Sequence, residues 1–121
     1  MKPLTKKELP AFLQRFGNFV DAEVRSIDVI SPSIMQVVIA AQDGARGFDW
    51  LTLNLEFSNI IDAKLIDNSK LSLIDMSEGM TLFFEDDNLA FCTDAYDNLA
   101  NVKNALFYII SSSIKYEEGS F

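Results

Sequence analysis

The sequence predicts an α+β fold: a mostly antiparallel β-sheet or sandwich with one N-terminal helix and a short helix before the last strand. Residues 50–57 alternate strictly between apolar and polar side chains, the pattern of a strand with one buried and one solvated face. Turn residues recur at roughly the eight- to twelve-residue spacing typical of antiparallel sheets. The chain has 121 residues and is expected to form a single domain, 1–121.

The N-terminal helix is expected between Thr5 and Phe16. Glu8 stands three residues after Thr5, which is the spacing of a capping box. Pro10 lies near the helix start, where the loss of its amide donor costs least. The apolar residues at helical spacing form one stripe, made of Leu9, Phe12, Leu13 and Phe16.

Four strands are expected in the next part of the chain. The first is Phe19–Ile30, and the second is Ile34–Ala41, whose β-branched residues predict burial on both faces. The third is the alternating segment that ends at Phe57. The pair Ser58-Asn59 is expected to break it, so that residues 60–66 form a separate fourth strand.

The following segment is expected to contain a short strand and a hairpin. Leu71 and Leu73 alternate with their neighbours and favour a short strand near residues 71–76. Residues 80–84 and 89–93 are typical of the two arms of a hairpin, closed by an acidic turn between them.

The last third of the chain leaves one alternative open. Residues 94–103 are expected to hold a helical turn with Asp97 as its N-cap. Residues 106–116 fit either a helix or a strand. Three serines and several β-branched or aromatic residues in this segment favour the strand.

Charge is distributed unevenly along the chain. The net charge is −8, and the segment from Asp75 to Val102 contains seven acidic residues and no Lys or Arg. Nucleic acid and anionic membranes are therefore disfavoured as partners, because their phosphates would be repelled, and a basic protein partner is favoured. The alternative is that the charge only keeps a small domain soluble. The acids expected to steer a partner are Glu85, Asp86, Asp87, Asp94 and Asp97.

The sequence predicts no catalytic residue, no metal ligand and no cofactor. The chain has no histidine, which removes imidazole bases and His-ligated metals. Cys92, the one cysteine, lies in an apolar segment and is expected to be a buried structural thiol. Ser112 and Lys115 have Ser-x-x-Lys spacing, but a strand would place them on opposite faces. We therefore expect a protein that is not an enzyme.

Two short runs carry a resemblance to a known class of proteins. Residues 16–24 read Phe-Gly-Asn-Phe-Val-Asp-Ala-Glu-Val, and residues 113–118 read Ser-Ile-Lys-Tyr-Glu-Glu. Both runs resemble small bacterial immunity-type proteins of toxin–immunity systems, in which the first motif is commonly Phe-His-Asp-Ala-Glu-Val. Val20 stands where that motif has His. The resemblance implies a sheet-rich protein that binds and neutralises a cognate toxin, often a nuclease with a basic surface.

Together these observations predict a non-enzymatic acidic binding protein. If its ring lies on the outer face, Trp50 would be the aromatic anchor of a partner interface. The alternative is a small-molecule-binding or structural module with an apolar cavity between sheet and helix, for which ten Phe and four Met supply material. An exposed edge strand would allow a homodimer. The N-terminal residues 1–8 are charged and no apolar run follows them, so a cytoplasmic location is expected.

Overall fold

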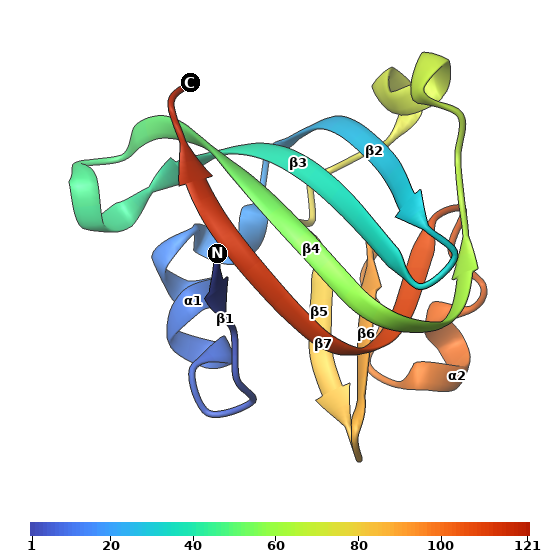
Figure 1. Cartoon of the computed structure of the whole chain (residues 1–121). Coiled ribbons are helices and arrows are strands. Elements are labelled where there is room, and N and C mark those ends of the chain that lie inside the picture. Colours follow the sequence, from blue (N-terminus) through green and yellow to red (C-terminus); the bar gives the residue numbers. More distant parts are fainter.

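One curved antiparallel sheet organises the molecule in the computed structural model, which describes residues 1–121. The strand order is β2-β3-β4-β7-β6-β5, with β1 beside β7 (Figure 1). The strands are β1 (Lys2–Pro3), β2 (Glu23–Ser31), β3 (Ile34–Asp43), β4 (Asp49–Lys64), β5 (Thr81–Glu85), β6 (Asn88–Cys92) and β7 (Tyr108–Gly119). The helices are α1 (Leu9–Arg15), α2 (Leu99–Val102) and the 3-10 turns η1 (Gly17–Phe19), η2 (Gly44–Arg46) and η3 (Asn68–Leu73). The predicted α+β class is confirmed.

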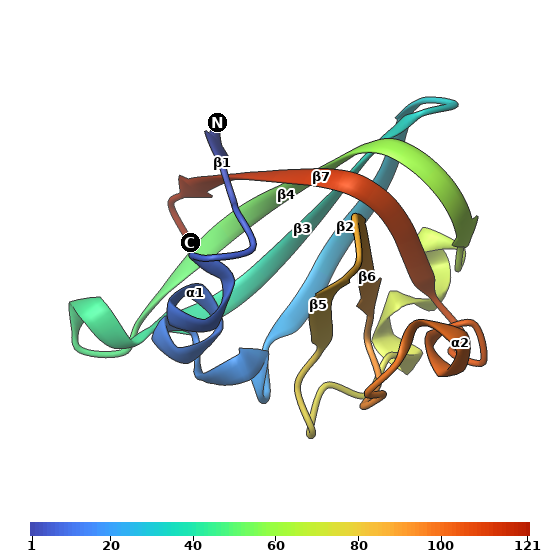
Figure 2. The ribbon, with the colours of Figure 1, turned by 90° about the horizontal axis from the view of Figure 1, so that it is seen from below.

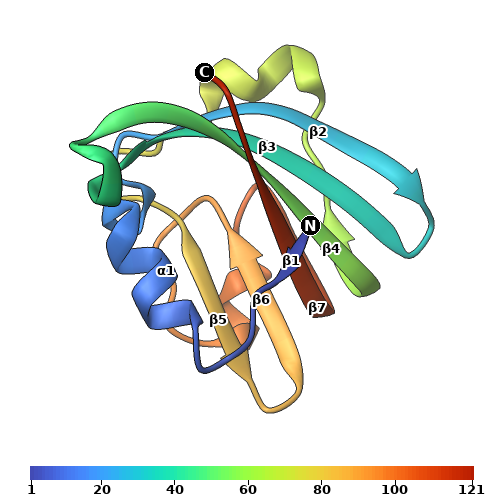
Figure 3. The same cartoon turned by 60° about the vertical axis from the view of Figure 1, so that its left-hand side comes forward.

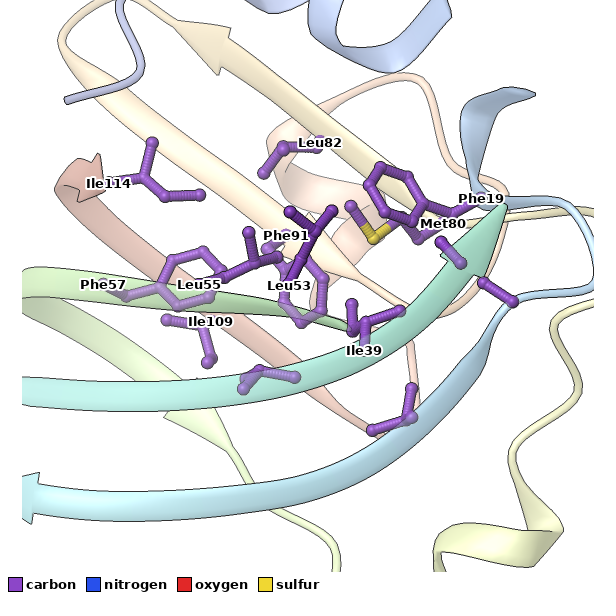
Figure 4. Packing of buried hydrophobic residues seen from close by; sticks show 14 of the residues in the cluster. Phe19, Ile39, Leu53, Leu55, Phe57, Met80, Leu82, Phe91, Ile109 and Ile114 are labelled. Carbon is purple, nitrogen blue, oxygen red and sulfur yellow. The ribbon is translucent and has the colours of Figure 1, made fainter. Parts of the chain in front are cut away.

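Helix α1 and the β5–β6 hairpin, which is the far end of the same curved sheet, lie on the concave side of β7, β4, β3 and β2. Figure 2 shows α1 and this hairpin beneath the arch formed by β7, β4, β3 and β2. The main core is a cluster of 24 buried residues in the space between them, and a second cluster of six buried residues includes Val102 of α2. Phe57 and Phe91 both belong to the main core (Figure 4), and their ring centroids are 5.0 Å apart. Large apolar side chains from both layers therefore fill the interior.

One face of β3 is buried throughout, whereas the other is half-buried or exposed except at Ala40, so the expectation of burial on both faces was wrong. Val37 and Ile39 point into the core and are fully buried. Gln36 and Val38 point outward and are half-buried. The reason is that α1 and the hairpin cover the concave face, whereas no element covers the convex face (Figure 2).

Ser58-Asn59 does not end the third strand, which was a second wrong prediction. β4 continues through this pair to Lys64 because β7 pairs with it along almost its whole length. The break in pattern is absorbed by a shift of register between Ile60 and Asp62 and by a positive φ of 57° at Asn59. A bulge of this kind bends a strand without ending it, which contributes to the curvature of the sheet.

The N-terminal helix begins later than expected, and its N-cap is Glu8, which makes no side-chain cap bond, so the expected capping box does not cap it. Thr5 Oγ1 donates a hydrogen bond to Glu8 Oε1 at 2.7 Å and accepts one from Glu8 N at 3.3 Å. Regular helix starts at Leu9. The first long strand also begins later, at Glu23, because the chain turns tightly through η1 and Asp21, where several residues have positive φ.

The expected strand at residues 71–76 is absent, and η3 takes its place. The hairpin and the final strand are confirmed as β5, β6 and β7. The short helix before the last strand is confirmed as α2, but its N-cap is Asn98, whose side chain accepts from Asn101 N at 2.8 Å. The prediction of Asp97 as the N-cap was therefore wrong, because the cap is the next residue.

A side chain of η3 covers part of the free edge of β2. Asn68 Oδ1 accepts a hydrogen bond from Ile27 N at 3.0 Å, and Asn68 Nδ2 donates to Ile27 O at 3.2 Å. One amide thus makes both bonds that a further strand would make. Exposed edges invite pairing with other chains, so this contact also blunts the edge.

We expect Asn68→Ala to destabilise the protein by about 1 kcal/mol, because two part-buried hydrogen bonds are lost. Hydrogen exchange at the Ile27 amide should accelerate in the same variant. The matched control is Asn104→Ala, which removes an exposed amide that makes no side-chain hydrogen bond. Equal exchange at Ile27 in the two variants would show that the Asn68 contact contributes nothing.

Candidate functional site

The acids predicted to steer a partner do not form one surface. Glu85, Asp86 and Asp87 surround the turn of the β5–β6 hairpin, whereas Asp94 and Asp97 follow the other end of β6. The five residues of β6 separate the two groups by roughly 15 Å. Figure 3 shows the hairpin turn at the bottom, at the opposite end from the point where β6 stops.

The group after β6 lies beside two adjoining hollows. The first, of about 320 Å³, is lined by the carboxylates Asp75, Glu78 and Asp94. The second, of about 560 Å³, is lined by Glu78 and Asp97 together with uncharged residues. No Lys or Arg lines either one. We call these four carboxylates and the space between them the acidic hollow.

Backbone hydrogen bonds orient two of these carboxylates. Asp75 Oδ1 accepts from Ser77 N at 2.9 Å, and this bond holds the pKa of Asp75 below its usual value. Asp94 Oδ1 accepts from Ala95 N at 3.0 Å. The loop that carries Asp94 is fixed by Thr81, whose hydroxyl donates to Asp94 O and accepts from Tyr96 N.

The loop that carries Asp75 and Glu78 is attached to η1. Asp21 N donates to Met76 O at 2.8 Å, and Met80 N donates to Asn18 O at 3.2 Å. Both contacts come from the run at residues 16–24. Its role in this structure is to hold the acidic loop in place.

Two exposed leucines complete the lining of the first hollow. Leu73 ends η3, Leu106 precedes β7, and each side chain is 70% exposed. Neither residue was predicted to belong to a site, because Leu73 was assigned to a short strand and Leu106 to the start of the last helix or strand.

Trp50 lies outside the acidic hollow. It is 41% exposed near the start of β4, and its ring centroid is 5.5 Å from that of Phe121. It lines a hollow of about 160 Å³ with Phe48 and Val20, among others. Val20 also lies beside Gly79 of the acidic loop, so the Trp50 region adjoins the acidic hollow without contributing to it.

One other group of polar side chains has a structural role. Arg15 binds the fully buried Asp43 through Nε and Nη2, at 2.9 and 2.7 Å, and also pairs with Glu118. Arg46 approaches the same two acids at 3.5 Å. The hydrogen bonds from Arg15 hold the pKa of Asp43 below its usual value. Two cations and two anions thus neutralise one another and join α1, β3, η2 and β7.

The remaining reactive groups are kept protonated by burial. Cys92 is fully buried, as expected, and burial raises the pKa of its thiol. Burial likewise raises the pKa of Tyr108, whose hydroxyl donates to Asp62 Oδ2 at 3.0 Å. No three His, Cys, Asp or Glu side chains are grouped in a way that could hold a metal ion.

A hollow also lies between α1 and the sheet, where an apolar cavity was one of the predictions. It measures about 250 Å³ and is lined by Leu4, Phe12 and Tyr116, together with Glu8 and Arg15. Sites for small molecules are usually 300–1,000 Å³ and mostly apolar. This hollow is below that range.

The chain matches no protein-family model, no curated protein and no solved structure. Neither of its α-helices, of seven and four residues, has the length and apolar character needed to cross a membrane.

Proposed function

We propose that this protein is a non-enzymatic binding protein whose acidic hollow binds a basic protein partner. The observation that carries the proposal is the convergence of Asp75, Glu78, Asp94 and Asp97 on two adjoining hollows that no Lys or Arg lines. A concave surface lined by one sign of charge attracts partners of the opposite sign and accelerates their association. Nucleic acid and anionic membranes would be repelled by the same field.

The resemblance of residues 16–24 and 113–118 extends this proposal to an immunity protein that neutralises a basic toxin. The first run supports the loop of the acidic hollow through Asn18 and Asp21. A motif that shapes the binding loop would be useful in a family of such proteins even without contact to the partner. In the proposed complex, Glu85, Asp86 and Asp87 contribute only to the distant field, because they lie at the far end of the hairpin.

The proposal is tested by two variants of equal charge. D75N/E78Q/D94N neutralises three acids at the hollow, and E85Q/D86N/D87N neutralises three at the hairpin turn. Each bait is used for capture from a lysate of the cells that produce the protein, at low salt. We expect one basic protein to be retained by wild type and by the hairpin variant and to be lost with the hollow variant.

The association rate then separates steering from a general effect of charge. For the captured protein we expect the hollow variant to reduce the on-rate about tenfold at low salt, with the difference shrinking at high salt. The hairpin variant should change it much less. If both variants reduced the on-rate equally, net charge alone would be acting and the hollow would have no special role.

A further inference from the structure

We propose that Leu73 and Leu106 anchor the partner, and that the segment they receive carries an apolar side chain next to Lys or Arg. This inference rests on the proposed function and names the chemistry of the partner for the same site. It differs from the sequence-based expectation, which gave the anchoring role to Trp50.

The two leucines converge on one hollow from distant parts of the chain. Leu73 is the last residue of η3, and Leu106 lies on the segment between α2 and β7. Both line the 320 Å³ hollow, and both are 70% exposed, the largest exposed fraction among the large apolar residues. A single exposed leucine needs no explanation, but two that line the same concavity form an apolar surface that a partner can cover.

The charge around these leucines selects the occupant. Asp75, Glu78 and Asp94 line the same hollow, and no cation lines it. A purely apolar segment would leave these carboxylates desolvated without partners, which is costly. An acidic segment would add repulsion. In a segment with an apolar residue flanked by Lys or Arg, the apolar side chain can cover the leucines while the cations pair with the carboxylates.

The two kinds of residue should affect different rate constants. Carboxylates at an open rim act at long range and mainly raise the on-rate. Leucines act only when they are covered, so they should mainly lower the off-rate. Loss of both leucines is therefore expected to shorten the lifetime of the complex and to leave its salt dependence unchanged.

The test uses two defined peptides as probes. One alternates leucine with lysine and arginine, and the other has serine in place of each leucine. We expect wild type to bind the leucine peptide at least about tenfold more tightly in a fluorescence anisotropy titration. The methyl resonances of Leu73 and Leu106 should shift during an NMR titration with the leucine peptide.

Three variants make the outcome specific. L73S/L106S should lose the preference for the leucine peptide while keeping the weak binding of the serine peptide. I61S is the matched control, because Ile61 is 61% exposed on β4 and does not line the hollow. It should behave as wild type. The D75N/E78Q/D94N variant should weaken the binding of both peptides.

Each contrary outcome has a separate meaning. If wild type binds both peptides equally or binds neither, or if L73S/L106S retains the preference, the leucine anchors are refuted. If the acid variant binds both peptides as wild type does, the proposed function fails as well. Sedimentation of the free protein tests whether a second copy of the chain covers the leucines instead of a basic partner. A wild-type dimer that becomes a monomer in L73S/L106S would show this and would overturn the proposed partner.

Discussion

Arg15→Met is expected to destabilise the protein by about 2–4 kcal/mol, because it leaves a buried carboxylate without its partner. Asp43 is fully buried, and both of its oxygens are bonded by Arg15, at 2.9 and 2.7 Å. Methionine keeps much of the apolar length of arginine but cannot neutralise the charge. The expected loss is below the largest values for buried pairs because the Arg15 side chain is 26% exposed.

Arg46→Met is the matched control and should cost no more than about 1 kcal/mol. Arg46 approaches the same carboxylate at 3.5 Å, but its side chain is 60% exposed. Chemical denaturation at pH 7 gives both values. Similar losses in the two variants would contradict the view that the pair of hydrogen bonds from Arg15 to Asp43 stabilises the contact between α1 and β3.

The difference between wild type and Arg15→Met should depend on pH. Arg15 lowers the pKa of Asp43 in the folded protein, so the ion pair contributes its full stability above the unfolded pKa of about 3.9. That contribution is lost as the pH falls through the folded pKa. The gap in unfolding free energy should therefore be widest near neutral pH and narrow below about pH 4. A gap that stays constant from pH 7 to pH 2.5 would exclude the carboxylate as its cause.

The sequence predicts those parts of the fold that depend on local pattern. Alternation identified the strand up to Phe57, the two arms of the hairpin and the final strand. The spacing of Thr5 and Glu8 identified a side-chain contact that is present, but this contact lies in the turn before α1, whose N-cap is Glu8. The break expected at Ser58-Asn59 was wrong because β7 pairs with β4 on both sides of the irregularity. The local sequence around Ser58 does not indicate this partner, because β7 lies far away in the chain.

The candidate site was only half predictable for a similar reason. The acidic segment is continuous in the sequence, but an antiparallel hairpin sends its turn and its ends to opposite sides of the molecule. Glu85 was therefore separated from Asp94, while Asp75, far from Asp94 in the chain, came to line the same hollow. The exposure of Leu73 depends on η3 leaving the sheet, which its alternation with neighbours did not reveal.

Gly79→Ala is expected to be as damaging as the loss of Arg15, at about 2–5 kcal/mol. Gly79 has a φ of +83°, which L-residues adopt only with strain. A Cβ at this position would also lie 2.2 Å from Asn18 O, so the backbone of one of the two turns would have to move. The nearby bond from Met80 N to Asn18 O would be strained by the same movement.

Gly47→Ala separates the two causes, because Gly47 has a φ of +64° but no atom within 4 Å of an added Cβ. It should show the conformational cost alone, about 1 kcal/mol. Thermal unfolding would then place Gly79→Ala roughly 10 °C or more below wild type and Gly47→Ala a few degrees below. Equal shifts would mean that the loop at Gly79 moves away from Asn18 without cost. A large shift at Gly79 accompanied by weaker binding of the leucine peptide would link the run at residues 16–24 to the shape of the acidic hollow, because Gly79 lies at one of the contacts between the two segments.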